Sequence, residues 1–254
     1  MPVNYREGVV ILINKPLGWT SFDVVHKVRN LIKKLPAEGE KPGELSRPKV
    51  GHAGTLDPLA TGVLIICTGK ETKNADKYQA DEKEYTGTIA IGATTPCYDL
   101  EKPIDQWFPT AHITDEKIYA ATEQFLGEIE QMPPIFSAKK IEGTRAYELA
   151  RKGKEAKLEA RKITIREFEI IKIRIEAMPA GMQEKLIKAD FRVVCSKGTY
   201  IRSLAFDFGN ILNSGAYLEN LCRTRSGNFR LENAISMEDF RKNITLTTVN
   251  SSEL

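Results

Sequence analysis

The chain has 254 residues, of which 41% are hydrophobic and 28% are charged, and its formal net charge is +3 at pH 7. This length suffices for one large domain or two small ones, and the composition excludes a fibrous or disordered chain. The longest apolar runs, Val9 to Ile13 and Val63 to Cys67, are too short to span a bilayer, and the N-terminus lacks a signal-peptide pattern. We therefore expect a cytoplasmic protein that does not bind membranes.

The expected elements alternate between strands and helices. The apolar and alternating runs predict strands at Gly8–Asn14, Val63–Cys67, Glu84–Gly92, Ile163–Ala177, Leu186–Cys195 and Tyr217–Arg225. Capping residues and helical periodicity predict helices at Thr20–Lys34, Glu71–Ala80, Thr114–Phe125, Gly143–Lys152 and Thr199–Leu212, and a last short helix capped by Ser236 and Asp239. This pattern indicates an α+β domain with a mixed β-sheet flanked by helices.

The stretch Lys49–Thr68 carries the chemistry-bearing residues. It holds three glycines, and it leads into the apolar run that begins at Val63, which would anchor a glycine-rich loop to a rigid core. Asp57 precedes Pro58, a pair that commonly starts a helix with the carboxylate as its cap. The alternative is a catalytic carboxylate in a loop built to hold a ligand, and Gly62 favours it because it would stop such a helix after one turn.

Two segments of the nearly neutral chain are basic. From Lys139 to Lys172 there are 11 Lys and Arg against 6 Asp and Glu, and from His26 to Lys49 there are 7 against 3. Such segments fit the footprint of a polyanion, because Lys and Arg that neutralise phosphates release counterions on binding. The alternative, a solvated helix face with interspersed glutamates, stays open at this level.

The cysteines and histidines indicate neither disulfides nor a metal. The four cysteines form no C-x-x-C pair, and Cys67 and Cys195 lie inside apolar strand-like runs, as reduced core residues do. The three histidines are scattered along the chain. We therefore expect no metal site.

Two long motifs together resemble the TruB family of tRNA pseudouridine synthases. The first is Gly-His-x-Gly-x-Leu-Asp-Pro-x-Ala-x-Gly at residues 51–62, and the second is Lys-Gly-Thr-Tyr-Ile-Arg-x-Leu at residues 197–204. Shorter matches extend the resemblance from Gly8 to about Phe229. The resemblance implies a pseudouridine synthase fold with an inserted RNA-binding thumb. It implies a single catalytic domain at 1–235 with the thumb at about 133–158, followed by a short C-terminal helix and tail at 236–254.

The implied reaction is a cofactor-free isomerisation of the T-loop uridine (U55) of tRNA to pseudouridine. By similarity Asp57 is the essential carboxylate, Arg202 is the cation that pairs with it, and Tyr85 stacks on the flipped uracil. The pairing matters because a carboxylate in a water-poor pocket tends to be protonated unless a cation lies close by. The resemblance does not separate covalent addition by Asp57 from removal of a sugar proton.

The resemblance also implies a set of substrate-binding residues. In the family the histidine at the position of His52 contacts RNA as the target nucleotide leaves the stack, which indicates binding and not acid–base chemistry. The basic thumb would contact the backbone of the T-arm without reading its sequence. The residues expected to bind substrate are His52, Gly54, Leu56, Tyr200, Leu221, Lys139, Arg145 and Arg151.

Two features depart from the family pattern. Many members carry a C-terminal RNA-binding module of the PUA type, whereas about 25 residues follow Phe229 here, as expected of a short-form member. Cys222 stands where an arginine is usual, which leaves Arg223 and Arg225 near the expected RNA edge.

Three alternatives remain for the function. A non-catalytic RNA-binding or tRNA-folding protein would have no need for Asp57, Tyr85 and Arg202 together. A guide-dependent synthase that modifies ribosomal RNA would need the C-terminal module to grip its guide. A uridine methyltransferase is disfavoured because no G-x-G-x-x-G loop follows a strand. We expect a monomer that binds tRNA and requires no protein partner.

Overall fold

The computed structural model describes residues 3–35, 48–79, 82–134, 140–141, 144–145, 158–177 and 185–249. The chain forms two compact units, one made of Met1–Lys83 with Cys222–Leu254 and the other of Glu84–Leu221. Strand β12 (Ala216–Ser226) contributes its first part to the second unit and its last part to the first. The predicted boundaries of the catalytic domain, the thumb and the C-terminal tail stay predictions. In the described part of the chain, no helix is long and apolar enough to cross a membrane.

The first unit is built around a buried central strand. Its elements are β1 (Val10–Lys15), α1 (Ser21–Lys33), β2 (Val50–Ala53), β3 (Ala60–Thr68), η1 (Gly69–Asn74), α2 (Ala75–Gln79), β13 (Phe229–Arg230), η2 (Leu231–Asn233) and α6 (Met237–Val249). Strand β3 pairs antiparallel with β1 and with β2. Its residues Leu64, Ile65, Ile66 and Cys67 are all fully buried, so both faces of this strand are covered. The turn that contains Asp57 leads directly into this strand, so its position is set by a rigid element.

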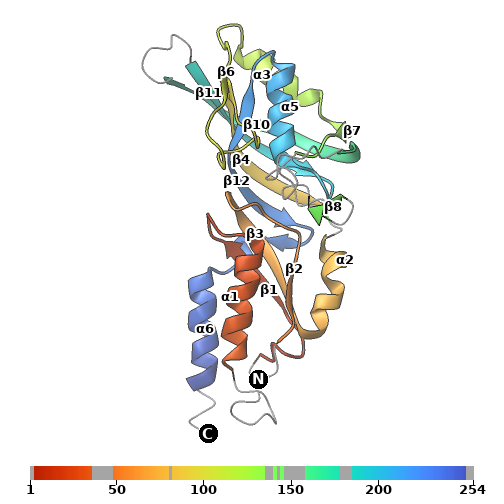
Figure 1. Ribbon diagram of the computed structural model, residues 1–254, viewed down its shortest axis with the longest axis vertical. Coiled ribbons are helices and arrows are strands. Elements are labelled where there is room, and N and C mark those ends of the chain that lie inside the picture. Colours follow the sequence, from red (N-terminus) through yellow and green to blue (C-terminus); the bar gives the residue numbers. More distant parts are fainter. Residues whose placement is uncertain are drawn as a thin grey trace. The chain divides into compact units, whose positions relative to one another are not determined.

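Helices α1 and α6 lie side by side (Figure 1). Helix α1 begins with the predicted capping box, in which Asp23 N donates to Thr20 Oγ1 and Thr20 N donates to the Asp23 carboxylate. Its buried face includes Val24, Val28 and Ile32. Helix α6 begins at the predicted cap, where the Ser236 hydroxyl accepts from Asp239 N, and it is longer than the short helix expected.

The second unit carries helices on a sheet of long strands. Its elements are β4 (Lys83–Ile91), β5 (Ala93–Thr94), β6 (Gln106–Trp107), α3 (Asp115–Glu123), β7 (Gly127–Gln131), β8 (Lys140–Ile141), β9 (Thr144–Arg145), β10 (Arg161–Ala177), β11 (Lys185–Cys195) and α5 (Ile201–Ile211). The strand order is β12-β4-β11-β10-β7. Strand β10 pairs antiparallel with β11 and with β7. Four packed rings form the core beneath α3 and α5, namely Phe125, Phe168, Phe191 and Phe208.

The predicted α+β class, a mixed sheet flanked by helices, is confirmed. The ladders described within each unit are antiparallel, and two isolated bridges, Ile13 with Ile235 and Asp99 with Leu218, are parallel. The predicted strands and helices are present within a few residues of their expected ends, with one exception.

The exception is the basic helix predicted at Gly143–Lys152, which is wrong at its start. Thr144 and Arg145 form strand β9, which pairs with Lys140 and Ile141 in a short hairpin. Strand pairing over so few residues satisfies the backbone locally, and the apolar periodicity that follows does not reveal it. The rest of the predicted helix lies outside the described residues.

Candidate active site

Asp57 lies on a turn and not at the start of a helix. Ala60 N donates to Asp57 O (3.1 Å), and strand β3 begins at Ala60, so the alternative of a helix cap at Asp57 is wrong. The side chain of Asp57 is half-buried. The turn thus presents a carboxylate between two strands, β2 and β3, that pair with each other.

The segment before α1 holds this turn from one side. Gly18 N donates to Pro58 O (2.8 Å), and the fully buried ammonium of Lys15 donates to the same oxygen (3.3 Å) and to the carbonyls of Pro16 and Trp19. Burial lowers the pKa of Lys15 to about 8, an effect that the nearby charge of Asp57 opposes. Lys15 therefore fixes the backbone next to Asp57 with hydrogen bonds to carbonyl oxygens.

Ser21 holds the other side of the same turn. Its hydroxyl accepts from Leu56 N (2.8 Å) and donates to Leu56 O (3.1 Å), and both residues are buried. Leu56, expected to bind substrate, is thus 3% exposed and its backbone is fully engaged with α1. The turn is anchored at Leu56 and Pro58, on both sides of Asp57.

Arg223 is a structural residue of this turn. Its side chain is 1% exposed, with Nε donating to Val63 O (2.8 Å) and Nη2 donating to Gly54 O (3.1 Å). Gly54 has a φ of +87°, and a side chain there would meet Arg223 Nη1 at 3.2 Å. Gly54 is thus a backbone acceptor for Arg223. Arg223, expected near the RNA edge, thus directs its guanidinium to carbonyl oxygens inside the first unit.

His52 lies in strand β2, opposite Ile66. Burial and the positive charge of Arg223 lower the pKa of His52, so the imidazole is neutral at pH 7. Its Nδ1 atom is buried and has no hydrogen-bond partner among the described residues. A neutral ring can contact a base by stacking or hydrogen bonding, and the binding role of His52 stays a prediction.

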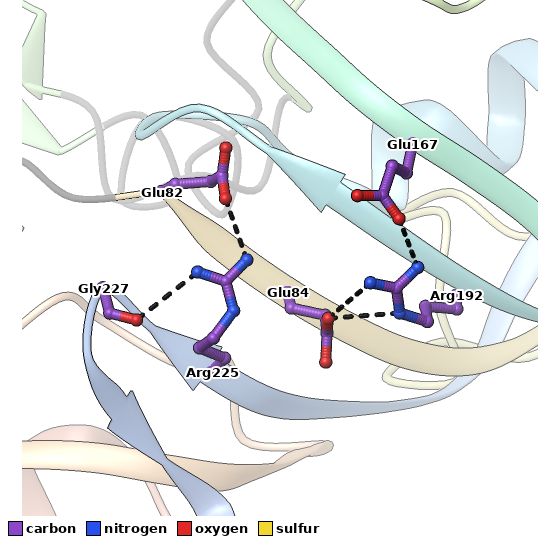
Figure 2. A network of polar contacts seen from close by, with 6 residues as sticks. All are labelled: Glu82, Glu84, Glu167, Arg192, Arg225 and Gly227. Atoms are coloured by element: carbon purple, nitrogen blue, oxygen red, sulfur yellow. Dashed lines mark hydrogen bonds and ion pairs between the residues drawn. The ribbon is translucent and has the colours of Figure 1, made fainter.

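In the second unit, Tyr85 lies on β4 and is 7% exposed. Its neighbour Glu84 pairs with Arg192 (Figure 2). The Nε and Nη2 atoms of Arg192 donate to Glu84 Oε2 (3.1 and 2.7 Å), and its Nη1 donates to Glu167 Oε2. Because successive side chains of a strand point to opposite faces, Tyr85 points away from this ion pair. The Arg192 clamp therefore fixes β4 against β11 and leaves the Tyr85 face to other contacts.

A second arginine clamp lies in the first unit. Arg225 Nη2 donates to Glu82 Oε1 (2.8 Å), and Nη1 donates to Gly227 O (3.4 Å), as Figure 2 shows. This guanidinium holds the residues just before β4 to the turn that joins β12 and β13.

Arg202 lies in the first turn of α5 and is 5% exposed. Its Nη1 donates to Cys97 O (3.2 Å), and its Nε lies 3.6 Å from Oδ2 of Asp99, which is 4% exposed. The resemblance predicted a charge partner for Arg202 and named Asp57. Within the second unit the structure supplies Asp99, from a segment in which the sequence predicted neither a helix nor a strand.

Tyr200 caps α5 at its N-terminus and is held through its backbone. The buried amide of Gln131 accepts from Tyr200 N (2.8 Å) and donates to Tyr200 O (3.0 Å), while the guanidinium carbon of Arg161 lies 5.5 Å from the centre of the tyrosine ring. Leu221, also expected to bind substrate, is 9% exposed on β12. The role of both residues as pocket walls stays a prediction.

The predicted thumb contacts are described only in part. Arg145 lies in strand β9, and Lys139 and Arg151 lie outside the described residues. Within the described ranges, no group of three or more His, Cys, Asp or Glu side chains is arranged to hold a metal ion.

Four residues that shape the site are not predicted by the sequence as parts of it. Ser21 stood at the start of the predicted helix Thr20–Lys34, and Asp99 and Gln131 lay outside every predicted element and motif. Lys15 was part of a match to the family, but nothing marked it as buried. A single polar residue of this kind has no sequence pattern that marks it as functional. The four residues are Lys15, Ser21, Asp99 and Gln131.

Comparison with known proteins gives close relatives. Residues 43–201 match the model of the TruB family pseudouridylate synthase, N-terminal domain. A tRNA pseudouridine synthase B of Flavobacterium johnsoniae is 53% identical over 243 residues, which cover 96% of this chain and 99% of the relative. The corresponding protein of Bacteroides thetaiotaomicron is 48% identical over 252 residues, which cover 99% of each chain.

Solved structures show the same fold at lower identity. A chain in the crystal structure of a Cbf5-Nop10-Gar1 complex aligns with a TM-score of 0.63 at 28% identity and covers 94% of this chain and 54% of its own length. A chain of an H/ACA RNP bound to a substrate RNA containing 2'-deoxyuridine aligns with a TM-score of 0.62 at 26% identity, covering 94% and 53%. This chain spans about half the length of these two.

The fold and the family match are thus those of a pseudouridylate synthase. The matched region includes the Gly51–Gly62 motif and the start of the Lys197–Leu204 motif. The chain belongs to the TruB family of these enzymes.

Proposed function

We propose that this protein isomerises the T-loop uridine of tRNA, U55, to pseudouridine. One observation carries the proposal, namely 53% identity over 96% of the chain to a tRNA pseudouridine synthase B of nearly the same length. The reaction breaks the bond between C1' of the ribose and N1 of the uracil and forms one between C1' and C5. The proton lost from C5 is balanced by one gained at N1, so the reaction consumes no co-reactant.

In this proposal Asp57 is the catalytic carboxylate, acting on the base or on the sugar. Support comes from its turn, whose backbone is fixed by Ser21 at Leu56 and by Lys15 and Gly18 at Pro58. A reacting group held this way loses little freedom when the substrate arrives, which is how positioning accelerates a reaction.

Tyr85 is proposed to stack on the uracil. Arg202 is proposed to pair with the carboxylate of Asp57 and keep it ionised. The low exposure of both residues, 7% for Tyr85 and 5% for Arg202, suits a pocket that excludes water from a detached base. Stacking on a tyrosine ring serves any base, because every base has a π face. Tyr200 and Leu221 are proposed as pocket walls, and His52 as a contact to RNA around the extruded nucleotide.

The proposed substrate is free tRNA, bound through its T-arm by a protein that acts as a monomer in the cytoplasm. The thumb residues Lys139, Arg145 and Arg151 are proposed to contact the phosphate backbone. By their titles, the structures with TM-scores of 0.62 and 0.63 come from an H/ACA RNP bound to a substrate RNA and from a Cbf5-Nop10-Gar1 complex. The relatives at about 50% identity are named as tRNA enzymes, which favours tRNA without a guide.

The test is incubation of the purified protein with an unmodified tRNA transcript, followed by position-resolved detection of pseudouridine. We expect modification at the single T-loop uridine without a guide RNA or an added protein. Asp57→Asn should abolish modification and retain tRNA binding. Asp76→Asn, a change at an exposed aspartate of the same unit, is the matched control and should modify tRNA at the wild-type rate.

Other outcomes would change the conclusion. Tight tRNA binding without modification by the wild-type protein leaves an RNA-binding or tRNA-folding protein. Modification at another position keeps the chemistry and overturns the substrate assignment. Full activity of Asp57→Asn would show that the Asp57 carboxylate is not catalytic.

A further inference from the structure

The turn that joins β5 to Asp99 contains an unusual backbone conformation. Tyr98 has a φ of +64°, and the only other non-glycine residue with positive φ in the described part of the chain is Asn213. The left-handed region is rarely occupied by bulky residues, because the side chain crowds the backbone. A conformation of this kind persists only where its surroundings determine it, and such residues gather at functional sites.

Three contacts hold Tyr98 in this conformation. Its ring stacks on the ring of Phe206 in α5, with the centroids 4.2 Å apart and the planes inclined by 20°. Its N–H donates to Thr95 O (3.1 Å), and its carbonyl accepts from Leu218 N on β12 (2.9 Å). The ring contact to α5 is the one that another side chain at this position would lose.

The residues on both sides of Tyr98 each contact Arg202. The carbonyl of Cys97 accepts from Arg202 Nη1, and the carboxylate of Asp99 lies by Arg202 Nε. The torsion angles of Tyr98 lie between these two groups along the chain. They therefore decide whether the carbonyl and the carboxylate face the same guanidinium.

The geometry of α5 links the two contacts. Phe206 follows Arg202 by four residues, so the two side chains lie on one face of the helix, one turn apart. The turn thus meets α5 at two successive positions, with the Tyr98 ring on Phe206 and its flanking polar groups on Arg202. Further hydrogen bonds brace the turn, from Thr95 Oγ1 and Cys97 Sγ to Asp99 O and from Glu101 N to Asp99 Oδ1.

We propose that Tyr98 is a positioning residue for pseudouridine formation: stacked on Phe206, it holds the left-handed turn that presents Cys97 O and the Asp99 carboxylate to Arg202. The inference rests on the proposed function and deepens it. Tyr98 acts through Arg202 and has no contact with the substrate in this role.

Three substitutions at Tyr98 separate the effect of losing the ring stack from the effect of the left-handed backbone conformation. Tyr98→Ala removes the stack and keeps the unfavourable φ, Tyr98→Gly removes the stack and tolerates the φ, and Tyr98→Phe keeps the ring. We expect Ala and Gly to lower the single-turnover rate of modification by about tenfold or more at saturating tRNA, as small misplacements of a reacting group do. The dissociation constant for tRNA should change less than about twofold. Tyr98→Phe should retain most of the rate.

Phe206→Leu removes the stack from the other side. It should reproduce the loss in rate, and the double variant with Tyr98→Gly should be little slower than either single variant, because both remove one interaction. The control is Asn213→Gly, which changes the other left-handed non-glycine residue, at the end of α5, and should leave the rate unchanged while altering stability.

The possible outcomes separate a failure of this inference from a failure of the proposed function. If the wild-type protein modifies tRNA and Tyr98→Gly does so at the wild-type rate, the stack has no positioning role and the inference fails alone. A loss in tRNA affinity with an unchanged rate would likewise overturn it. If the wild-type protein forms no pseudouridine, the proposed function fails and takes the inference with it.

Discussion

The Nε atom of Arg202 lies 3.6 Å from Oδ2 of Asp99, and both side chains are only 6% exposed. Removing one charge of such a buried pair costs about 3 kcal/mol or more, because the other charge stays in a place of low polarity. We expect Asp99→Asn to lower both the stability and the modification rate, the rate by about a hundredfold, since the guanidinium loses its orientation. Denaturant unfolding and single-turnover assays measure the two effects. Asp105→Asn, at an exposed aspartate of the same unit, should change neither, and equal rates for the two variants would contradict the role of Asp99.

Ser21 makes a reciprocal pair of hydrogen bonds with the backbone of Leu56, next to Asp57. Ser21→Ala leaves a buried N–H without its acceptor, which costs about 1 to 3 kcal/mol. We expect lower stability together with a lower modification rate, because the turn that carries the carboxylate loses an anchor. Ser236→Ala removes the cap of α6 at a cost of about 1 kcal/mol and should leave the rate unchanged. If both variants keep the wild-type rate, Ser21 contributes to stability only and does not position the Asp57 turn for the reaction.

Gly62 follows the Asp57 turn with a φ of +105°, and a Cβ there would lie 2.3 Å from Arg223 O. Gly62→Ala therefore forces a backbone shift in addition to an unfavourable φ, and we expect a loss of about 2 kcal/mol or more in the free energy of unfolding. Gly51 offers a matched control on β2, since no atom of the described residues lies within 4 Å of the position that a Cβ would take there. Gly51→Ala should be neutral or slightly stabilising in the same denaturant titration. A neutral Gly62→Ala would show that β3 and β12 are not in close contact at this point.

Burial raises the pKa of Asp207 from 3.8 to about 6. Between these two values the folded protein keeps a proton that the unfolded chain releases, so this group makes the protein less stable as the pH rises from about 4 to about 6. Asp207→Asn removes the dependence and should stabilise the protein by about 1 to 2 kcal/mol at pH 7.5, after allowance for the partial exposure of the carboxyl. At pH 4.5 the gain should be much smaller. Urea titrations at the two pH values measure it, and an equal gain at both would contradict the assignment.

The four cysteines are thiols, and Cys222 is the most accessible of them. Burial raises the pKa of Cys67 to about 11 and also raises the pKa of Cys97, and Cys195 is fully buried. Since the thiolate is the reactive form, we expect a thiol reagent to label one group quickly in the native protein and four after unfolding. Cys222→Ser should remove the fast phase. Rapid labelling of more than one thiol would show that the core opens readily.

Local sequence signals predicted most elements because the relevant physics is local. Thr20 and Asp23 form the expected capping box, and Val63 to Cys67 form a buried strand, since both patterns are complete within a few residues. The strand at Thr144–Arg145 was missed because short-range strand pairing competes with helical periodicity over the same stretch. The sequence also did not show which polar side chains make buried tertiary contacts. The sequence left Arg223 near the expected RNA edge, yet it is buried. Its partners, Val63 and Gly54, lie 160 and 169 residues away in the sequence, so no local pattern reveals these contacts.

For the site, the motifs named residues and the structure showed how they are held. His52 and Leu56 were predicted as substrate contacts from the resemblance, but nothing in the sequence indicated that Leu56 is anchored to Ser21. Asp99 could not be recognised before folding, because a single aspartate in a polar loop has no pattern. Its pairing with Arg202 joins residues more than 100 positions apart.

The turn around Asp57 is held through the carbonyls and N–H groups of its main chain, which every residue except proline possesses in the same form. Thr55, which is exposed between Gly54 and the buried Leu56, is consequently a position whose side chain can vary without loosening the turn. A library that randomises the surface of this turn while keeping Lys15, Ser21 and Arg223 would sample new substrate contacts on an unchanged frame. The same arrangement would let the RNA preference change one residue at a time, because each single variant would keep the fold.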